Sequence, residues 1–384
     1  MSTVRVMFVS HTGAIAGAEM VLLDVVRASP GASAFLFEDG PLNAALASKG
    51  LSVTLSKWGR GLTRFHRDSS ILKVVPLVGR LSAIVFEIAR EARRHHIVYA
   101  NSQKAFVLSA IASMIVRRPL VWHLHDIIDG AHFGAMQRRI QVVLANWRAT
   151  KVVVPSNAAA SAFVAQGGRS DLIEVIANGI DDIPESHSPA ELRRLLMLPE
   201  GTLLGVFSRL ARWKGQHVIL RALTQLPGVN CIIVGDALFG EDAYAAELKK
   251  MVEELGLGDR VRFLGQRSDV PRLMRAVDVM LHPSIDPEPF GRTLVEAMLA
   301  GVPVIATNTG AAPDILDQGR AGILIAPNDP EALAKAVRKV LAGTGDLADR
   351  LTYAVTRART HYDVNQMLNA VTRLIDHVSC GVAA

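Results

Sequence analysis

Two carboxylates eight positions apart mark the run EPFGRTLVE, which extends from Glu288 to Glu296. The run follows a predicted strand that ends in LHPS. It leads into TLVEAMLAG, which is typical of a short helix ended by Gly301. A helix that begins after a rigid Pro-Phe-Gly turn offers its first backbone N–H groups to an anion such as phosphate. Glu288 would then face whatever is attached beyond that phosphate.

The second acid, Glu296, could serve the structure of the helix and not a ligand. Thr293 and Glu296 fit a capping box, an N-cap hydroxyl with an acid three positions later. The capping box does not account for Glu288, which precedes the predicted helix. Two acids and a helix N-terminus would fit three parts of one nucleotide-sugar: the sugar hydroxyls, the diphosphate and the ribose hydroxyls.

Cations follow the first predicted strand of the second half, in FSRLARWKG (207–215). Arg209 and Lys214 stand five residues apart in the loop that leaves the strand's carboxyl end. An arginine donates to two oxygens at once and a lysine supplies a point charge, so the pair would suit a diphosphate. Two solvated surface cations are the alternative.

Histidines mark a strand of the first half, in VWHLHDI (121–127). Alternate residues of a strand share a face, so we expect His123 and His125 on one face, with His125 at the carboxyl end and Asp126 in the loop. His125 could donate a hydrogen bond or a proton. The alternatives are a core histidine satisfied by the backbone, which suits His123 more, and a metal pair for which no third ligand is evident.

Glycines also open the first predicted helix, in SHTGAIAGAEM (10–20). Gly13 and Gly17 would let the backbone approach an anion closely. The dinucleotide fingerprint G-x-G-x-x-G is absent. A plain strand-to-helix turn explains the loop equally well.

The elements that position these residues alternate short apolar runs with helical patterns, which is typical of parallel sheets covered by helices. The alternation restarts after NGIDDIPESHSP (178–189), a predicted linker. We therefore predict an α/β chain of two Rossmann-like domains over 1–183 and 184–361, with a helical segment over 362–384. Ligands bind such sheets at the carboxyl ends of their strands.

Charge is uneven along the 384 residues, whose net charge is +6. Residues 1–180 hold 20 Lys and Arg against 11 Asp and Glu. This excess indicates an anionic partner or a solvated basic face. Nucleic acid is not expected, because the basic half lacks interleaved aromatic residues and any reading motif.

No apolar stretch reaches the roughly 18 residues of a membrane span. With two cysteines, Cys231 and Cys380, and no signal peptide in MSTVRVMFVSHTG, we expect a reducing, cytoplasmic location. Peripheral contact with the inner membrane face is predicted from KWGRGLTRFHR (57–67), EARRHH (91–96) and MQRRI (136–140).

The acid pair with its flanks, EPFGRTLVEAMLAGVPVIAT, resembles the signature of the family 4 glycosyltransferases, retaining enzymes of the GT-B fold. SRLARWKG, IANGID (176–181), VRFLGQRSDVPRLMRAVDVMLHPS (261–284) and GAIAGAE (13–19) resemble that family in the expected order. The resemblance covers nearly the whole chain. It implies that the last helix crosses back onto the first domain.

The resemblance implies transfer of a hexose from a UDP- or GDP-linked sugar to a glycan or lipid-diphosphate acceptor, in envelope polysaccharide, O-antigen or glycolipid synthesis. Glu288 would hold the sugar and Glu296 the ribose, Arg209 and Lys214 the diphosphate, and His125 the sugar's C6 hydroxyl. No metal or other cofactor is expected. The remaining donor contacts would be Gly17, Arg267, Phe290, Gly291, Arg292, Thr293 and Leu294; those to the acceptor would be Asn101, His123 and Asp126.

The sequence departs from the family in TGAAPDI, where Ala311 and Asp314 replace the usual Gly and Glu, and at Ala16, which replaces a glycine. An epimerase or phosphorylase on the same fold, or an inactive scaffold, is the alternative. No phosphate or cofactor-lysine motif supports a phosphorylase. A scaffold would have lost the acids or the cations, and both are present.

Overall fold

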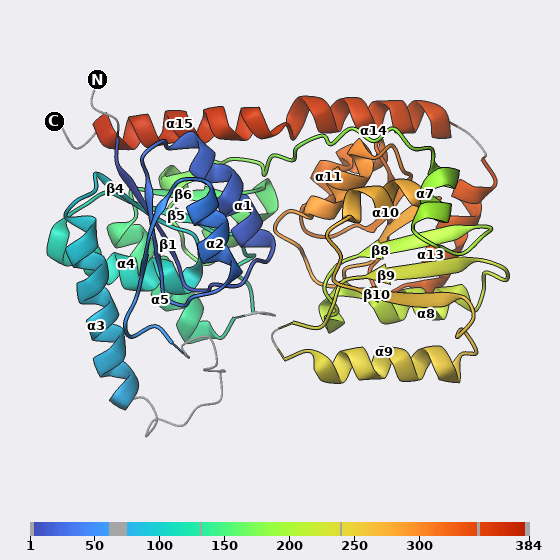
Figure 1. Cartoon of the computed structure of the whole chain (residues 1–384), viewed down its shortest axis with the longest axis horizontal. Coiled ribbons are helices and arrows are strands. Elements are labelled where there is room, and N and C mark those ends of the chain that lie inside the picture. The colour runs from blue at the N-terminus through green and yellow to red at the C-terminus, as the bar shows by residue number, and fades with distance from the viewer. Residues whose placement is uncertain (1–3, 61–74, 131–132, 239, 344–345, 381–384) are drawn as a thin grey trace. The chain divides into compact units, whose positions relative to one another are not determined.

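The computed structural model describes residues 4–60, 75–130, 133–238, 240–343 and 346–380 (Figure 1). It divides into two compact units, one formed by residues 1–179 and 364–384 and the other by residues 180–363. The stretch 61–67 of the predicted membrane-contact segment lies outside the described residues.

The first unit is built on a seven-stranded parallel sheet of order β3-β2-β1-β4-β5-β6-β7. Its strands are largely buried apolar runs, as expected for a parallel sheet covered on both faces. They are β1 (Val6–Ser10), β2 (Ser33–Leu36), β3 (Ser52–Leu55), β4 (Ile97–Ala100), β5 (Leu120–His123), β6 (Lys151–Val154) and β7 (Ile173–Val175).

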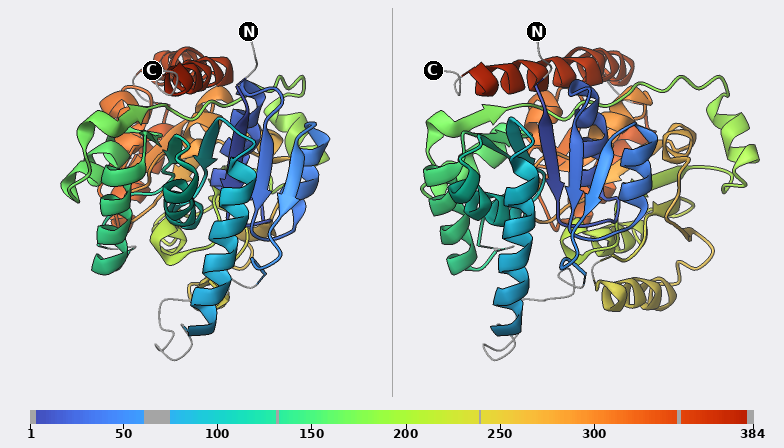
Figure 2. Two further views of the ribbon diagram at one scale, coloured as in Figure 1. Left: turned by 90° about the vertical axis from the view of Figure 1, so that its left-hand side faces the viewer. Right: turned by 60° about the vertical axis from the view of Figure 1, so that its left-hand side comes forward.

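Helices cover both faces of this sheet. One core lies between the sheet and α3 (Val75–Ala92), α4 (Gln103–Val116), α5 (Ala135–Arg148) and α6 (Asn157–Ala165). A second core joins the other face to α1 (Gly17–Val25), α2 (Pro41–Ser48) and α15 (Val364–Cys380). Buried residues of α15 recur every three or four positions, and this stripe is part of the second core. Figure 2 shows α15 lying along the first unit.

The second unit repeats the design with six parallel strands of order β10-β9-β8-β11-β12-β13. The strands are β8 (Leu203–Phe207), β9 (Asn230–Val234), β10 (Val261–Gly265), β11 (Val279–His282), β12 (Val304–Thr307) and β13 (Ile323–Ile325). The helices are α7 (Pro189–Leu195), α8 (Gln216–Leu223), α9 (Asp242–Glu254), α10 (Val270–Ala276), α11 (Arg292–Leu299), α12 (Ala312–Ile315), α13 (Pro330–Leu341) and α14 (Leu347–His361).

Each sheet has one place where the strand order reverses, between β1 and β4 in the first and between β8 and β11 in the second. Loops diverge at the carboxyl ends of such a pair and leave room for a ligand. Several residues singled out in the sequence follow these strands: Asn101 follows β4, Arg209 follows β8, and the acid run follows β11. Topology therefore selects the two loop clusters that carry chemistry.

The predicted fold class, two doubly wound parallel-sheet domains with a final helix on the first, is confirmed. The predicted strand over 120–125 is shorter than expected, because β5 ends at His123 and places His125 in the following loop. None of the helices within the described residues has the length and apolar character to cross a membrane.

Candidate functional site

The loop from Pro283 to Gly291 is held in place by two glycines of neighbouring loops. A Cβ on Gly215 (φ +72°) would lie 2.1 Å from the Pro283 carbonyl oxygen, and one on Gly310 (φ +59°) would lie 2.3 Å from the Glu288 nitrogen. Only glycine fits such a close approach. The loops that follow β8 and β12 thus clamp the acid run and set the position of Glu288.

Further backbone hydrogen bonds reinforce this clamp. Ile285 donates its N–H to the Trp213 carbonyl at 2.7 Å, and Ala311 donates to the Glu288 carbonyl at 3.0 Å. Ala311, one departure from the family pattern, is buried and acts here through its backbone. Asp314 lies in α12, where its carboxylate accepts from Gln318 at 3.4 Å.

The Glu288 carboxylate is buried in a group of donors. Its Oε1 lies 2.6 Å from Lys214 Nζ and 2.9 Å from His282 Nε2, and it accepts a hydrogen bond from the Ser284 hydroxyl. Although burial alone would raise the pKa of Glu288, the charges of His282 and Lys214 and their hydrogen bonds hold it well below its usual value. Glu288 is therefore an ionised buried carboxylate.

All three donors contact the same oxygen of Glu288. Among the described residues no partner contacts Oε2. A carboxylate oxygen without a protein donor can accept from a ligand hydroxyl. His282 and Ser284 were missed as site residues in the sequence, where LHPS reads only as a strand end. A histidine and a serine at the carboxyl end of a central strand were the available signal.

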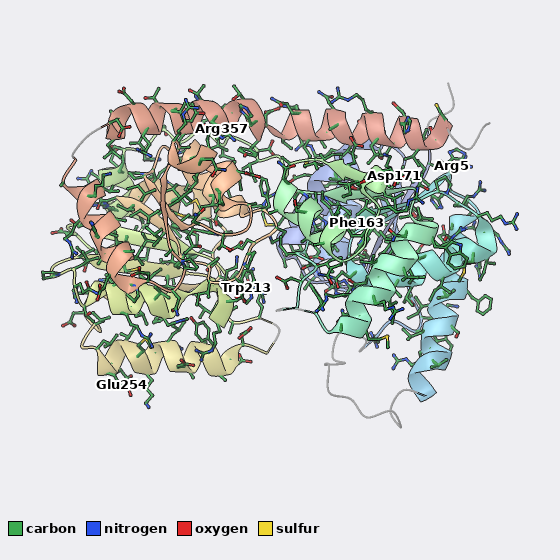
Figure 3. All side chains as sticks on the ribbon, turned by 180° about the vertical axis from the view of Figure 1, so that it is seen from behind. Arg5, Phe163, Asp171, Trp213, Glu254 and Arg357 are labelled. Atoms are coloured by element: carbon green, nitrogen blue, oxygen red, sulfur yellow. The ribbon has the colours of Figure 1, made fainter. Side chains whose placement is uncertain are left out.

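Lys214 and Arg209 meet at one aromatic ring. Lys214 Nζ lies 4.3 Å, and the Arg209 guanidinium carbon 5.3 Å, from the centre of the Trp213 ring, which Figure 3 labels. Burial lowers the pKa of Lys214, against the opposing charge of Glu288. Gln216, buried behind the loop, donates to the Arg209 carbonyl at 2.9 Å. The two cations are thus brought together as the sequence suggested.

The capping-box prediction for Thr293 and Glu296 is wrong. Helix α11 starts at Arg292, with Gly291 as N-cap in a left-handed conformation (φ +95°) and no side-chain cap. Thr293 is consequently the second residue of the helix, and its hydroxyl lies 3.3 Å from His282 Nδ1. The Gly turn begins the helix earlier than the Thr signal suggested.

Glu296 is part of the second turn of α11. Its carboxylate lies 3.8 Å from Arg292 Nε, and its side chain is 20% exposed. Burial raises the pKa of Glu296, against the opposing charge of Arg292. Nearby Phe290 is buried 5.7 Å from the ring of Tyr362, and Leu294 is buried beneath the Gly291 turn.

Arg267 lies beyond the end of β10, at some distance in sequence from this cluster. It is exposed and forms a two-pronged ion pair with Asp269, at 2.8 and 2.7 Å. The second unit therefore gathers Arg209, Lys214 and Glu288 with the start of α11, while Arg267 stands on a separate edge loop. The role of its backbone toward a base stays a prediction.

In the first unit, His125 is oriented by Asn101. The amide nitrogen of Asn101 donates to the Ala18 carbonyl at 3.2 Å, so its Oδ1 is the acceptor for His125 Nε2 at 3.0 Å. His125 therefore carries its hydrogen on Nε2. Asp126 accepts from Gln103 Nε2 at 3.0 Å. The residue directly after β4 thus sets the histidine's tautomer.

His123 lies beneath His125, with ring centres 3.9 Å apart. Its Nδ1 is 2.9 Å from the Tyr99 hydroxyl, and burial lowers the pKa of His123 well below its usual value. These contacts favour the core alternative over an acceptor contact for His123. A metal-binding group is not present in the described residues, where no three His, Cys, Asp or Glu side chains gather.

His11, which follows β1, is a third residue that the sequence did not single out. Its Nδ1 lies 2.8 Å from the Ser102 hydroxyl. Burial, aided by the charge of Lys104, lowers the pKa of His11 to about 4. The signal was its position directly after the first central strand.

The glycine loop that follows β1 has two distinct positions. Gly13 packs against the Asp39 backbone, where a Cβ would lie 2.4 Å from the carbonyl carbon. Gly17 is exposed as the first residue of α1, where a Cβ would meet no atom of another segment within 4 Å. In α1 the buried Glu19 accepts from the Ala16 N–H at 3.2 Å.

Two family profiles match the chain. The profile described as Glycosyl transferases group 1 matches residues 192–374, and the one described as Glycosyl transferase 4-like domain matches residues 16–179. Among solved structures, the Anabaena protein HepE in complex with UDP-glucose is 37% identical, with a TM-score of 0.87. The match covers 97% of this chain and 99% of HepE.

Curated relatives match over shorter stretches. The lipopolysaccharide core mannosyltransferase LpsB of Rhizobium meliloti (strain 1021) is 29% identical over 53% of this chain and 60% of its own. The 2-deoxystreptamine glucosyltransferase of Streptomyces kanamyceticus is 32% identical over 51% of this chain and 56% of its own. The chain thus spans less than two thirds of the length of these curated relatives.

The profiles, which together match most of both units, and the nearly full-length similarity to HepE agree with the two parallel sheets. The chain belongs to the family 4 glycosyltransferases, with the GT-B fold.

Proposed function

We propose that the chain transfers a hexose, with retention of anomeric configuration, from a UDP-sugar to a glycan or lipid-linked acceptor. The observation that carries the proposal is the buried, ionised Glu288, whose Oε1 is held by three protein donors while Oε2 faces none among the described residues. This carboxylate lies where the strand order of the second sheet reverses, the usual ligand position of such sheets.

In the proposed donor complex, Glu288 Oε2 accepts hydroxyls of the sugar. Arg209 and Lys214 balance the charge of the diphosphate, and the uncapped start of α11 adds backbone N–H groups. Glu296 accepts from the ribose. Phe290 to Leu294 and the backbone near Arg267 complete the donor contacts of this unit. UDP-glucose is proposed as the donor because HepE was crystallised with UDP-glucose. A GDP-linked sugar is the alternative donor.

The proposed chemistry depends on stabilising the leaving group. As the bond to the diphosphate breaks, negative charge grows on its oxygens, and fixed cations stabilise that charge. In the proposed retaining route, the acceptor enters on the leaving-group face and a donor phosphate oxygen takes its proton. His125, with its hydrogen on Nε2 held by Asn101, and Gly17 are proposed as contributions of the first unit. Protein cations take the charge-balancing role, so no metal is required.

The proposal also covers the acceptor and the location of the protein in the cell. Asn101 and Asp126 are proposed to contact the acceptor. An envelope polysaccharide or glycolipid pathway is supported by relatives such as LpsB, whose name places it in lipopolysaccharide core synthesis. We further propose that the protein works at the cytoplasmic face of an anionic membrane.

A panel of UDP-glucose, UDP-galactose, UDP-GlcNAc, GDP-mannose, UDP and GDP, scored by thermal shift and then by transfer, tests the proposal. A ligand at about 100 times its Kd adds close to 3 kcal/mol of stability, which is enough to move Tm by several degrees. We expect UDP-glucose and UDP to shift Tm and GDP not to. Retention is checked by NMR of the product's anomeric configuration. An epimerised free donor or an inverted product would overturn the proposal.

A further inference from the structure

Helix α5 exposes an apolar stripe. Met136, Ile140, Val143 and Trp147 are 72%, 45%, 56% and 63% exposed. Their spacing of four, three and four residues places them along one face of the helix. The opposite side is already packed on the sheet through buried Val142 and Ala145. The stripe is therefore a second apolar face, which the described residues of the unit leave exposed.

The neighbouring helix α4 also exposes apolar side chains at its end. There Met114 and Ile115 are 40% and 46% exposed. The two helix ends are joined by Arg148 of α5, which donates to the Ser113 hydroxyl at 3.1 Å and to the Ser113 carbonyl at 2.9 Å. Large exposed apolar side chains that gather in this way mark an interaction surface.

Cations surround the same end of the two helices. An open hollow of about 560 Å³ is lined by Arg117, Arg118, Trp147, Arg148, Lys151 and His377. These residues lie near the amino ends of β5 and β6, since Arg118 comes shortly before β5 and Lys151 opens β6. They are therefore at the edge of the sheet opposite His125. Arg5 and Asp171, which precede β1 and β7, mark this edge in Figure 3.

The cations are held in position mainly by uncharged groups. Arg118 donates to the Arg93 carbonyl at 3.0 Å and Lys151 to the Asp171 carbonyl at 3.1 Å, and carbonyls carry no net charge. Of the four cations of the hollow, Lys151 alone has a carboxylate within 4.0 Å in the described part of the chain, that of Glu174. The pKa of nearby His96 is lowered by burial and then by Arg5 and Arg118, as expected beside positive charge.

An apolar stripe with an interfacial tryptophan, bordered by cations, has the chemistry of a bilayer contact. Nucleic acid would use the cations but not the stripe. We infer that α5 lies in the plane of an anionic phospholipid bilayer, with its stripe in the headgroup region and the hollow of Arg117, Arg118, Arg148 and Lys151 on lipid phosphates. The α5 surface would be the site of the membrane contact proposed above. The sugar-transfer proposal does not depend on it.

The stripe on α5 runs between the two edges of the sheet. Helix α5 follows the loop that carries His125 and Asp126, so Met136 marks the end of the stripe nearer to these residues and Trp147 the end at the opposite edge. A bilayer along the whole stripe would therefore reach the edge of the sheet from which His125 projects. A lipid-linked acceptor could then remain anchored in the bilayer during transfer.

Flotation of the full chain with vesicles tests the inference. Vesicles of phosphatidylglycerol and phosphatidylcholine in equal parts are compared with vesicles of pure phosphatidylcholine. Each is tested at about 50 mM salt, where surface charges attract, and at about 500 mM salt, where their attraction is largely screened. We expect binding to the anionic vesicles at low salt. Ile140→Ser with Trp147→Ser, and separately Arg117→Gln with Lys151→Gln, should each reduce the bound fraction at least tenfold.

Matched controls come from the second unit. Ile183→Ser with Leu195→Ser removes side chains of similar exposure, 55% and 57%, and Lys249→Gln with Lys250→Gln removes two charges of α9. These pairs should float like the unchanged protein. All variants should keep the Tm shift with UDP-glucose, so that loss of flotation is separated from failure of the donor proposal.

Two outcomes would overturn the inference. One is flotation that is absent, or equal for all variants. The other is a dimer in sedimentation that the Ile140 and Trp147 pair of substitutions converts to a monomer, which would make a second copy of the chain the occupant of the stripe.

Discussion

The two places where strand order reverses have the same topology but opposite electrostatics. In the second unit, a buried carboxylate is kept ionised by a lysine and a histidine that share one oxygen. In the first, His11 and His123 have a lowered pKa, and hydroxyls of Ser102 and Tyr99 are their partners. Burial disfavours charge unless a counter-charge is provided. One cluster is thus built to hold charge and the other to stay neutral.

This difference fits a division of labour under the proposed function. A diphosphate brings charge to the second unit, where Arg209 and Lys214 are ready for it. An acceptor hydroxyl is neutral, and the neutral amide of Asn101 can bind it without a charge to compensate.

The largest effect is expected from Glu288→Gln. The substitution keeps the shape of the side chain and removes the charge, so the sugar loses its anionic acceptor and Lys214 its counter-charge. We expect transfer to fall roughly 10³-fold, near the upper range for loss of one preorganised electrostatic contact. Initial rates with saturating UDP-glucose measure it. Activity within threefold of the unchanged protein would remove Glu288 from the proposed mechanism.

The free energy of unfolding is a second measurement for Glu288→Gln, and it should fall. An uncompensated buried lysine costs on the order of 3 kcal/mol. Because the folded pKa of Glu288 is depressed, its stabilising contribution is present above the unfolded pKa and is lost as the pH falls through the folded pKa. Urea unfolding between pH 3 and 7 should therefore show less acid sensitivity in Glu288→Gln.

The next largest effect is expected from Gly215→Ala. The new Cβ would lie 2.1 Å from the Pro283 carbonyl oxygen, so the clamp on the acid run must move. Gly228→Ala is the matched control, because Gly228 has a similar φ of +74° with no atom within 4 Å of a Cβ. Both variants should lose about 1–2 kcal/mol from left-handed strain. Only Gly215→Ala should also lose donor affinity in titrations with UDP; equal losses would mean that the clamp does not position the site.

His11→Gln tests the neutral character of the first cluster. The pKa of His11 is lowered from 6.5 to about 4, so the unfolded chain binds more protons between these values. Stability from this residue is full above pH 6.5 and is lost as the pH falls through 4, by up to about 3 kcal/mol. We expect the variant to show a flatter pH dependence of the unfolding free energy in this window. An unchanged slope would mean that His11 is not kept neutral by its surroundings.

The smallest effect is expected from Glu296→Ala. Loss of one ribose contact should raise KM for the donor about tenfold, the equivalent of 1.4 kcal/mol, with kcat nearly unchanged. Since Glu296 forms no capping box with Thr293, the unfolding free energy should change by less than about 0.5 kcal/mol. A larger fall in kcat than in affinity would place Glu296 at the reacting centre instead.

Much of the architecture could be read from patterns that depend on neighbouring residues. Continuous β-branched runs such as Val152–Val154 and the 3–4 spacing of Val364, Met367 and Val371 reflect burial on both faces of a sheet or on one side of a helix. The cations and the acids were found because their loops follow central strands. Two predicted boundaries were wrong. The strand β5 ends at His123 and not at His125, and helix α11 begins at Arg292 because the left-handed Gly291 turn starts it before Thr293.

From the sequence came two parallel-sheet domains, the positions of Arg209, Lys214 and Glu288 in loops that follow predicted strands, and the basic excess of the first half. These follow from periodicity, composition and order along the chain. Tertiary structure alone decided that His282 and Ser284 share Glu288 Oε1, that Asn101 sets the tautomer of His125, and that α5 leaves an apolar face exposed. Such facts depend on which side chains converge from distant segments, and on which face of a helix the core has already used.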